Sequence, residues 1–292
     1  MNKIKFITDS TTDLPEAMLS EMDVDIVPLS VVFGEEIYSS LEITSNDLYK
    51  KVSETGKLPH TVAPPPALFG QHFKKWLDKN YDIFYVGIGS KYSATFQNAY
   101  LAAMDLPQDR IRLSDSGSLS SAIGLQLLKA HKLYKEGKNL QEIGYYVDGL
   151  APYTHLQFTV KNMDYLYKGG RCNGLQYLMG TLVKAHPFVI LKDGEMKLVS
   201  TPKGNIYKAL DKVLQNLKEH VDYGIDSDHV MLTSSAANDY EQYLLKGASE
   251  FLDPQKVTLV HIGPICACHG GPGSIGFGFI STTLEQAPSE EH

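Results

Sequence analysis

The strongest constraint on the fold is a repeated order of apolar strand, polar turn and helix. The stretch 81–100, YDIFYVGIGSKYSATFQNAY, shows one unit of this order. Residues 82–88 form a short run rich in β-branched and aromatic side chains, with Gly87 and Gly89 at its end, which predicts a buried strand. Ser93 follows as the expected N-cap of a helix that continues to residue 100. Repeated units of this kind are typical of a parallel α/β sheet.

The same order extends through the first half of the chain. We expect strands at residues 3–8, 25–33, 82–88 and 110–113, and helices at 44–55, 67–79, 119–135 and 140–150. Asp13 and Glu16 have the spacing of a capping box, which predicts a further helix from there to about residue 20. Thr44 and Asp47 predict a second capping box at the start of the helix at 44–55.

The pattern changes after about residue 152. We expect strands at 154–160, 228–233 and 256–262, helices at 205–221 and 237–246, and a hairpin of 187–191 with 195–200 around the Asp-Gly turn. The prediction is therefore an α/β protein of two α/β domains, with a ligand between them. Residues 1–155 would carry a mainly parallel sheet, residues 156–283 a mixed sheet, and residues 284–292 would form a polar, frayed tail.

Polar turns follow three of the expected parallel strands. They contain Asp9 and Ser10, then Ser93, then Asp115 and Ser116. Such turns lie along one edge of a parallel sheet, where ligands bind. The turn at Ser93 combines small residues with a helix N-terminus, which is suited to a phosphate or a carboxylate. An ordinary capped turn between strand and helix is the alternative.

Composition narrows the class of function. The net charge is −7, without a dense Lys/Arg stripe, which argues against a nucleic-acid partner. No apolar run approaches the roughly 18 residues of a membrane span, and the first residues do not resemble a signal peptide. Three cysteines do not make a fully paired disulfide framework. We therefore expect a cytoplasmic protein without a membrane span.

Two motifs that suggest cofactors do not meet the requirements of their chemistry. Residues 271–276 spell the dinucleotide pattern G-x-G-x-x-G, but residues 275–280 alternate like a strand, whereas the mechanism needs a helix there. Cys266, Cys268 and His269 lack a second ligand pair at zinc spacing, so we interpret them as small buried residues in a strand. The sequence thus predicts neither a metal nor a cofactor.

Three other features remain as candidate site material. Thr61 lies in a loop stiffened by prolines, which would hold its hydroxyl in place. Arg171 follows Lys168 and two glycines, where it would either pair with an acid or follow a simple helix C-cap. His269 precedes a Gly-Gly-Pro-Gly segment, beside backbone that can approach a ligand closely.

The order and spacing of these stretches over nearly the whole chain resemble the DegV family of bacterial lipid-binding proteins. The matching stretches are 6–10, 27–30, the Thr61 loop, 90–99, 115–121, 168–171, 263–264 and 269–273. The resemblance implies a long-chain fatty acid, similar to palmitate, in an apolar tunnel, with Thr61 and Ser93 holding its carboxylate. It further implies that His269 lies near this head group and that Arg171 lies near its exposed side.

The resemblance also implies a lipid carrier in fatty-acid metabolism, which in some family members presents the acyl chain to a fatty-acid kinase. Family members that partner a kinase often carry Arg-Thr at the position where this chain has Thr201, Pro202 and Lys203. Polar side chains are usual in the family at the positions where this chain has Val62 and Ala63. The alternative is an acyl hydrolase, an acyl transferase or an enzyme resembling dihydroxyacetone kinase, which would use Ser93 or His269. No catalytic set follows from spacing, so we expect a protein that is not an enzyme.

Overall fold

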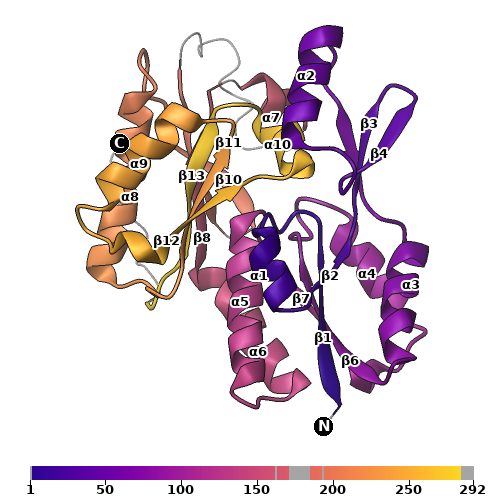
Figure 1. Cartoon of the computed structure of the whole chain (residues 1–292). Coiled ribbons are helices and arrows are strands. Elements are labelled where there is room, and N and C mark those ends of the chain that lie inside the picture. The colour runs from indigo at the N-terminus through magenta and orange to yellow at the C-terminus, as the bar shows by residue number, and fades with distance from the viewer. Residues whose placement is uncertain (1, 162, 171–184, 193, 284–292) are drawn as a thin grey trace.

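Two main β-sheets, one in each half of the sequence, organise the chain (Figure 1). The computed structural model describes residues 2–161, 163–170, 185–192 and 194–283. The N-terminal sheet is parallel and the C-terminal sheet is mixed, as the sequence predicts.

The N-terminal sheet contains four strands in the order β2-β1-β6-β7. Their bounds are β1 Lys3–Asp9, β2 Asp25–Val27, β6 Tyr81–Gly87 and β7 Ile111–Asp115. Alternate side chains enter opposite cores because the side-chain period of a strand is two. In β6, Ile83 and Tyr85 pack with α3 (Pro66–Leu77) and α4 (Thr95–Ala103), whereas Phe84 and Val86 pack with the helices of the other face. These helices are α1 (Glu16–Glu21), α5 (Ser121–Lys135) and α6 (Leu140–Leu150).

A three-stranded antiparallel sheet stands beside the parallel one, and it corrects the strand expected at 25–33. This segment breaks after β2 and continues as β3 (Ser30–Phe33), which pairs with β4 (Glu36–Ser39) and β5 (His60–Val62). Pro28 lies at the break and has no N–H to donate to a ladder. Helix α2 (Ser45–Thr55) follows, opened by the predicted capping box of Thr44 and Asp47.

The capping box expected at Asp13 is wrong. Helix α1 begins at Glu16 after Pro15, with no side-chain cap. Asp13 has a φ of 51°, and its carboxylate accepts hydrogen bonds from Ser120 Oγ at 2.6 Å and from the Gly263 amide at 2.7 Å. Long-range partners therefore take the place of the local cap.

The C-terminal sheet has six strands in the order β10-β9-β8-β13-β11-β12. Their bounds are β8 Thr154–Thr159, β9 Phe188–Lys192, β10 Glu195–Ser200, β11 Val230–Ser235, β12 Val257–His261 and β13 Ser274–Ile280. Strands β11 and β12 are parallel, and the predicted hairpin of β9 and β10 is antiparallel. Within the described residues, the α-helices of this half are α7 (Asp164–Lys168), α8 (Tyr207–Tyr223), α9 (Asn238–Ala248) and α10 (Pro264–Gly270). Short 3₁₀ turns lie at Gln108–Arg110, Ala151–Tyr153 and Pro254–Lys256.

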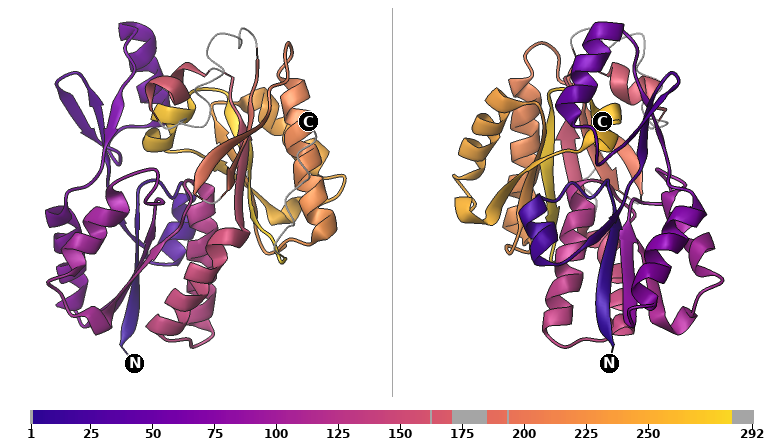
Figure 2. Two further views of the ribbon diagram at one scale, coloured as in Figure 1. Left: turned by 180° about the vertical axis from the view of Figure 1, so that it is seen from behind. Right: turned by 45° about the vertical axis from the view of Figure 1, so that its right-hand side comes forward.

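Helices α8 and α9 cover the face of the C-terminal sheet that is turned away from the N-terminal half (Figure 2). The other face packs against α5, which also packs against the N-terminal sheet. Every residue of α5 from 121 to 127 is therefore buried, although it contains Ser121 and Gln126. A helix buried all round is expected where two sheets share it.

Glycines in β13 allow α5 to approach this closely. Side chains of Ile275, Phe277 and Phe279 enter the core beneath α8 and α9. On the opposite face, a Cβ added to Gly278 would lie 2.6 Å from Ser121 Oγ of α5. The segment that resembles a dinucleotide fingerprint thus runs from a turn at 271–273 into β13, the strand that the alternation of 275–280 predicts, and the strand glycines Gly276 and Gly278 serve close packing.

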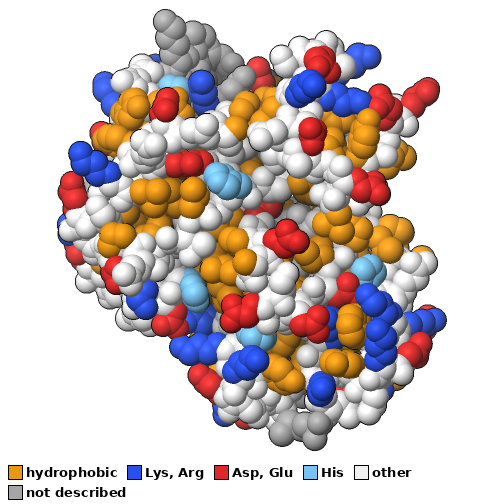
Figure 3. All heavy atoms as spheres, in the orientation of Figure 1, with side chains coloured by type: hydrophobic (Ala, Val, Ile, Leu, Met, Phe, Trp, Pro, Cys, Tyr) orange, Lys and Arg blue, Asp and Glu red, His pale blue; other side chains and the backbone are white. Residues whose placement is uncertain are grey.

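None of the described helices has both the length and the apolar character that crossing a membrane requires. On the face drawn in Figure 3, Lys and Arg side chains are interspersed with Asp and Glu side chains.

Candidate functional site

A cavity lies between the two halves of the molecule, and together with its opening to solvent it contains about 840 Å³ of space. Much of its wall is apolar. The N-terminal half contributes Leu29, Ile88 and Leu119, and the C-terminal half contributes Leu156, Phe158 and Met196. Thr61, Ser93 and His269, which are far apart in the sequence, also line this cavity.

Thr61 and His269 are in direct contact. Thr61 is in β5, opposite Val31, and its Oγ1 lies 3.0 Å from His269 Nε2. His269 is in α10 rather than in the strand expected there. Pro264 opens this helix at a position where a missing N–H has no cost, and Gly271 follows its end. The helical spacing places Cys266 and His269 one turn apart, and both line the cavity.

Ser93 also lines the cavity, but it is not the helix N-cap. Helix α4 begins at Thr95 with Ala94 as N-cap. Ser93 Oγ lies 2.8 Å from Thr95 Oγ1 and accepts from the Thr95 amide at 3.2 Å. Within the described residues, no hydrogen bond takes up the amide N–H of Ser93 or of Ala94. The turn therefore has donors to offer to an anion.

The turns that follow β1, β6 and β7 meet at the carboxyl edge of the parallel sheet, as predicted. The Ile88 amide donates to Asp9 Oδ2 at 2.8 Å, and the Ser90 amide donates to Asp115 Oδ1 at 3.1 Å. Asn98 of α4 donates to the carbonyl of Pro64 at 2.8 Å, which ties the Thr61 loop to the Ser93 turn. The cavity itself is lined by Thr11 and Ser120 from these turns rather than by Ser10 or Ser116.

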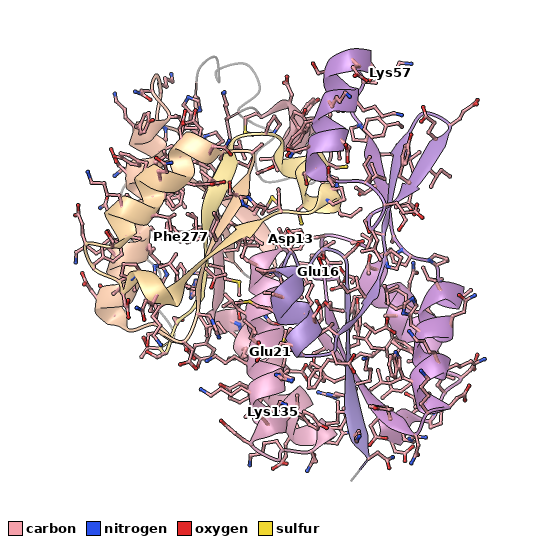
Figure 4. The ribbon with its side chains drawn as sticks, viewed as in Figure 1. Asp13, Glu16, Glu21, Lys57, Lys135 and Phe277 are labelled. Atoms are coloured by element: carbon pink, nitrogen blue, oxygen red, sulfur yellow. The ribbon has the colours of Figure 1, made fainter. Side chains whose placement is uncertain are left out.

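Sequence reasoning missed the role of Asp13, which lies near the centre of the view where the two halves meet (Figure 4). Besides Ser120 and Gly263, Cys266 lies beside its carboxylate. Burial raises the pKa of Asp13 to about 7, against the opposing effect of these donors. Only the tertiary contacts identify this residue, because its sequence spacing suggested a local cap instead.

A glycine makes room for His269. A Cβ added to Gly169, the C-cap of α7, would lie 2.4 Å from His269 Nδ1. Gly170 follows with a φ of 67°, so the expected helix C-cap is present in this turn. Arg171, the fourth predicted site residue, lies outside the described residues, as does the tail at 284–292.

Tyr92 is a further cavity residue that sequence reasoning missed. Its position directly before Ser93 was the available signal. Tyr92 packs against the cluster of Ala122, Leu156 and Leu191, as do Leu119, Phe158 and Met196, and its hydroxyl is buried. It therefore belongs to the apolar part of the wall although it carries a polar atom.

The described residues do not assemble a metal centre, and they do not pair Ser93 with His269. No group of three or more His, Cys, Asp or Glu side chains among them is arranged to hold a metal ion. Ser93 pairs with Thr95, and His269 pairs with Thr61, so in the part of the chain described here Ser93 lacks the contact with His269 that nucleophilic catalysis needs.

Comparison with known proteins gives a consistent relationship. A family model described as "Uncharacterised protein, DegV family" matches residues 3–282. A DegV domain-containing protein of Clostridium acetobutylicum is 31% identical over 286 residues, covering 96% of this chain and 99% of the relative.

Solved structures share the fold. A Thermus thermophilus DegV family protein, described by its fatty-acid binding, has a TM-score of 0.86 at 28% identity and covers 96% of this chain and 99% of its own. A stearic-acid-binding protein from Eubacterium ventriosum has a TM-score of 0.83 at 26% identity, with 95% and 98% covered. The family match spans both sheets and every described element that lines the cavity, and the chain belongs to the DegV family.

Proposed function

We propose that this protein is a carrier that binds one long-chain fatty acid, such as palmitate, in the cavity between its two sheets. The observation that carries the proposal is the composition of the wall. Thr61, Ser93 and His269 supply polar atoms, while Leu119, Leu156, Phe158, Met196 and their neighbours supply an apolar surface. A ligand with one polar end and a long apolar body matches this wall. The fatty acids named for related structures support the same class.

The hydrogen bonds of the polar residues leave protons for a carboxylate. Ser93 Oγ accepts from the Thr95 amide, and its own proton can be given to a ligand. Thr61 has the same freedom when His269 carries its proton on Nε2 and donates to Thr61 Oγ1. Two hydroxyls and the amides at the start of α4 would then hold the anion, which is the kind of site a helix N-terminus favours.

The apolar part of the ligand would supply most of the binding free energy. A tail of roughly 16 to 18 carbons gains on the order of 12 kcal/mol gross, at about 0.8 kcal/mol for each buried CH₂. Ordering the chain and losing its free motion offset much of this gain. The remainder is sufficient for tight binding, so the head group needs only a few neutral donors.

The carrier would work in the cytoplasm as a non-enzymatic protein of two domains that meet near residue 155. Presentation of the acyl chain to a fatty-acid kinase, with Arg171 near the exposed head group, is part of the proposal. Because Pro202 departs from the family pattern, the kinase partner needs its own test, which is a pull-down with a kinase subunit.

The test is mass spectrometry of ligands extracted with solvent from the purified protein, followed by titration of the extracted protein with palmitate. We expect about one long-chain acid for each chain and saturable uptake of palmitate. Absence of a stoichiometric acid, together with no uptake, would overturn the proposal. The double variant Thr61→Val and Ser93→Ala is the matched control, because it keeps the apolar wall and removes two of the donors.

A further inference from the structure

Asp13 lies behind the cavity wall, at the point where three segments of the chain meet. It belongs to the turn between β1 and α1, and its carboxylate accepts hydrogen bonds from Ser120 Oγ, just before α5, and from the Gly263 amide, just before α10. The thiol of Cys266, in the first turn of α10, lies beside the same carboxylate. Ser120 and Cys266 themselves line the cavity. The Asp13 carboxylate is therefore in direct contact with side chains of the wall.

The polar end proposed for the ligand lies on the same wall. Cys266 and His269 are three residues apart on α10, which places them on one face of the helix and about 4.5 Å apart along its axis. His269 Nε2 in turn lies 3.0 Å from Thr61 Oγ1. A ligand carboxylate held by Thr61 and Ser93 would thus share a mostly apolar region with the Asp13 carboxylate.

The surroundings of Asp13 do not favour a negative charge. The donors that contact its carboxylate are neutral groups, and Asp9, at the end of β1, adds a second carboxylate that opposes ionisation. Burial, the largest effect, raises the pKa of Asp13 to about 7, and burial also raises the pKa of the Cys266 thiol, which stays protonated. The other titratable group on this face of α10 is His269. Asp13 therefore gains or loses its proton near neutral pH.

An anionic ligand would change this balance. Like charges repel more strongly in a buried region than in water, so a second carboxylate raises the free energy of ionised Asp13. A fatty acid has an ordinary carboxylic acid group, with a pKa of about 4 to 5, and it ionises before Asp13 does. The ligand therefore keeps its charge, and Asp13 is the group that takes up a proton.

We propose that fatty-acid binding is coupled to proton uptake by Asp13, which makes this buried acid a pH-dependent regulator of the site. This inference rests on the proposed fatty-acid-binding function and adds its regulation. The ligand is held most tightly where Asp13 is protonated, and its affinity falls as the pH rises through the range in which Asp13 ionises in the free protein. The coupling acts through charge, so it needs no contact between Asp13 and the ligand. Because linkage is reciprocal, a bound anion raises the pKa of Asp13 further.

The experiment titrates palmitate, and the neutral 1-hexadecanol of the same chain length, into the delipidated full-length protein at about pH 6 and about pH 8.5. We expect the Kd of palmitate to rise by about threefold to thirtyfold, where thirtyfold corresponds to one full proton taken up by an acid whose pKa in the free protein is about 7. The Kd of 1-hexadecanol should not change. Isothermal titration of palmitate at about pH 8, in two buffers of different ionisation enthalpy, counts the proton directly and needs no variant.

Two variants separate Asp13 from the histidine of the same site. Asp13→Asn is uncharged at every pH, and its amide oxygen can still accept from Gly263, so the Kd of palmitate should no longer depend on pH. His269→Gln removes the contact with Thr61 and should bind palmitate more weakly. It retains Asp13, so its Kd should still rise with pH by the same factor as in the wild type.

The outcomes distinguish this proposal from fatty-acid binding itself. A Kd of palmitate that is the same at both pH values, or a proton count of zero, overturns the role of Asp13 and leaves fatty-acid binding standing. An equal pH dependence for 1-hexadecanol, or one that persists in Asp13→Asn, overturns it as well. Failure to bind palmitate at either pH overturns both proposals. If Asp13→Asn does not fold, the two ligands and the proton count in the wild type decide the question.

Discussion

At the scale of single residues, Ser93 lines the cavity although the local prediction made for it is wrong. It was expected to cap α4, but Ala94 occupies that position, and Ser93 lies one residue earlier in the cavity wall. Its Oγ is hydrogen-bonded to Thr95 Oγ1 and also accepts from the Thr95 amide. The serine is therefore held in place by the turn, and its proton is available when Thr95 is the donor in the pair of hydroxyls.

Replacement of Ser93 by alanine should weaken fatty-acid binding without unfolding the protein. We expect a loss of about 1–2 kcal/mol in binding free energy, roughly fivefold to thirtyfold in Kd, because a carboxylate loses one donor. Isothermal titration with palmitate measures it, and circular dichroism checks the fold. An unchanged Kd would contradict the assigned role.

Asp13 leads to a prediction about pH. Its pKa of about 7 in the folded state is above the ordinary 3.8, so the folded protein binds the proton more tightly than the unfolded chain. The free energy of unfolding contributed by this group is therefore fully present below about pH 4 and is lost as the pH rises through about 7, by up to about 4 kcal/mol.

The variant Asp13→Asn removes this dependence while its amide oxygen can still accept from Gly263. We expect the free energy of unfolding of the variant to rise relative to the wild type between about pH 4 and pH 7. Urea unfolding at several pH values measures the difference. A difference that stays constant with pH would contradict it.

At the scale of elements, the packing of β13 against α5 decides whether the two halves can share one helix. Gly278 and Ser121 meet at a distance that leaves no room for a methyl group. Gly276 is closer still to the neighbouring strand, since an added Cβ would lie 1.8 Å from the Gln157 carbonyl oxygen. The alternate glycines of β13 therefore allow its neighbours to approach closely, while the aromatic rings between them fill the core on the other face of the strand.

Gly278→Ala should destabilise the protein by about 1–3 kcal/mol, the cost of overpacking. Ser121→Ala removes the clashing oxygen and should recover part of this loss in the double variant, apart from the hydrogen bond lost with Thr233. Chemical unfolding of the four proteins gives the coupling energy. If the effects of the two changes on the free energy of unfolding are simply additive, the contact between Gly278 and Ser121 does not limit the packing. Gly276→Ala should not be rescued, because its clash is with backbone.

At the scale of the whole molecule, the cavity is walled by both halves, so a bound ligand should stabilise them together. Loading the delipidated protein with palmitate at about 100 times Kd should add about 2.7 kcal/mol to the free energy of unfolding. Thermal unfolding of loaded and delipidated protein measures this as a rise in Tm with one transition. No rise, or a rise of equal size in the Thr61→Val and Ser93→Ala double variant, would contradict the proposed site.

The sequence by itself determined the class of fold, because alternation of apolar and polar residues at periods of two and 3.6 reports which face of an element is buried. It placed the hairpin of β9 and β10, the capping box of α2 and the length of α5 close to where they lie. It also selected Thr61, Ser93 and His269, through the resemblance rather than through their spacing.

Tertiary structure alone decided what these residues contact. Asp13 does not cap a helix locally but accepts hydrogen bonds from Ser120 and Gly263. The segment around His269 is a helix rather than the expected strand, and it places the imidazole ring in contact with Thr61. Such contacts join positions up to 250 residues apart, and local patterns carry no information about partners at that separation. The unpaired hydroxyl of Tyr92 is visible only after every neighbour has been placed, because it is defined by the absence of a partner among the described residues.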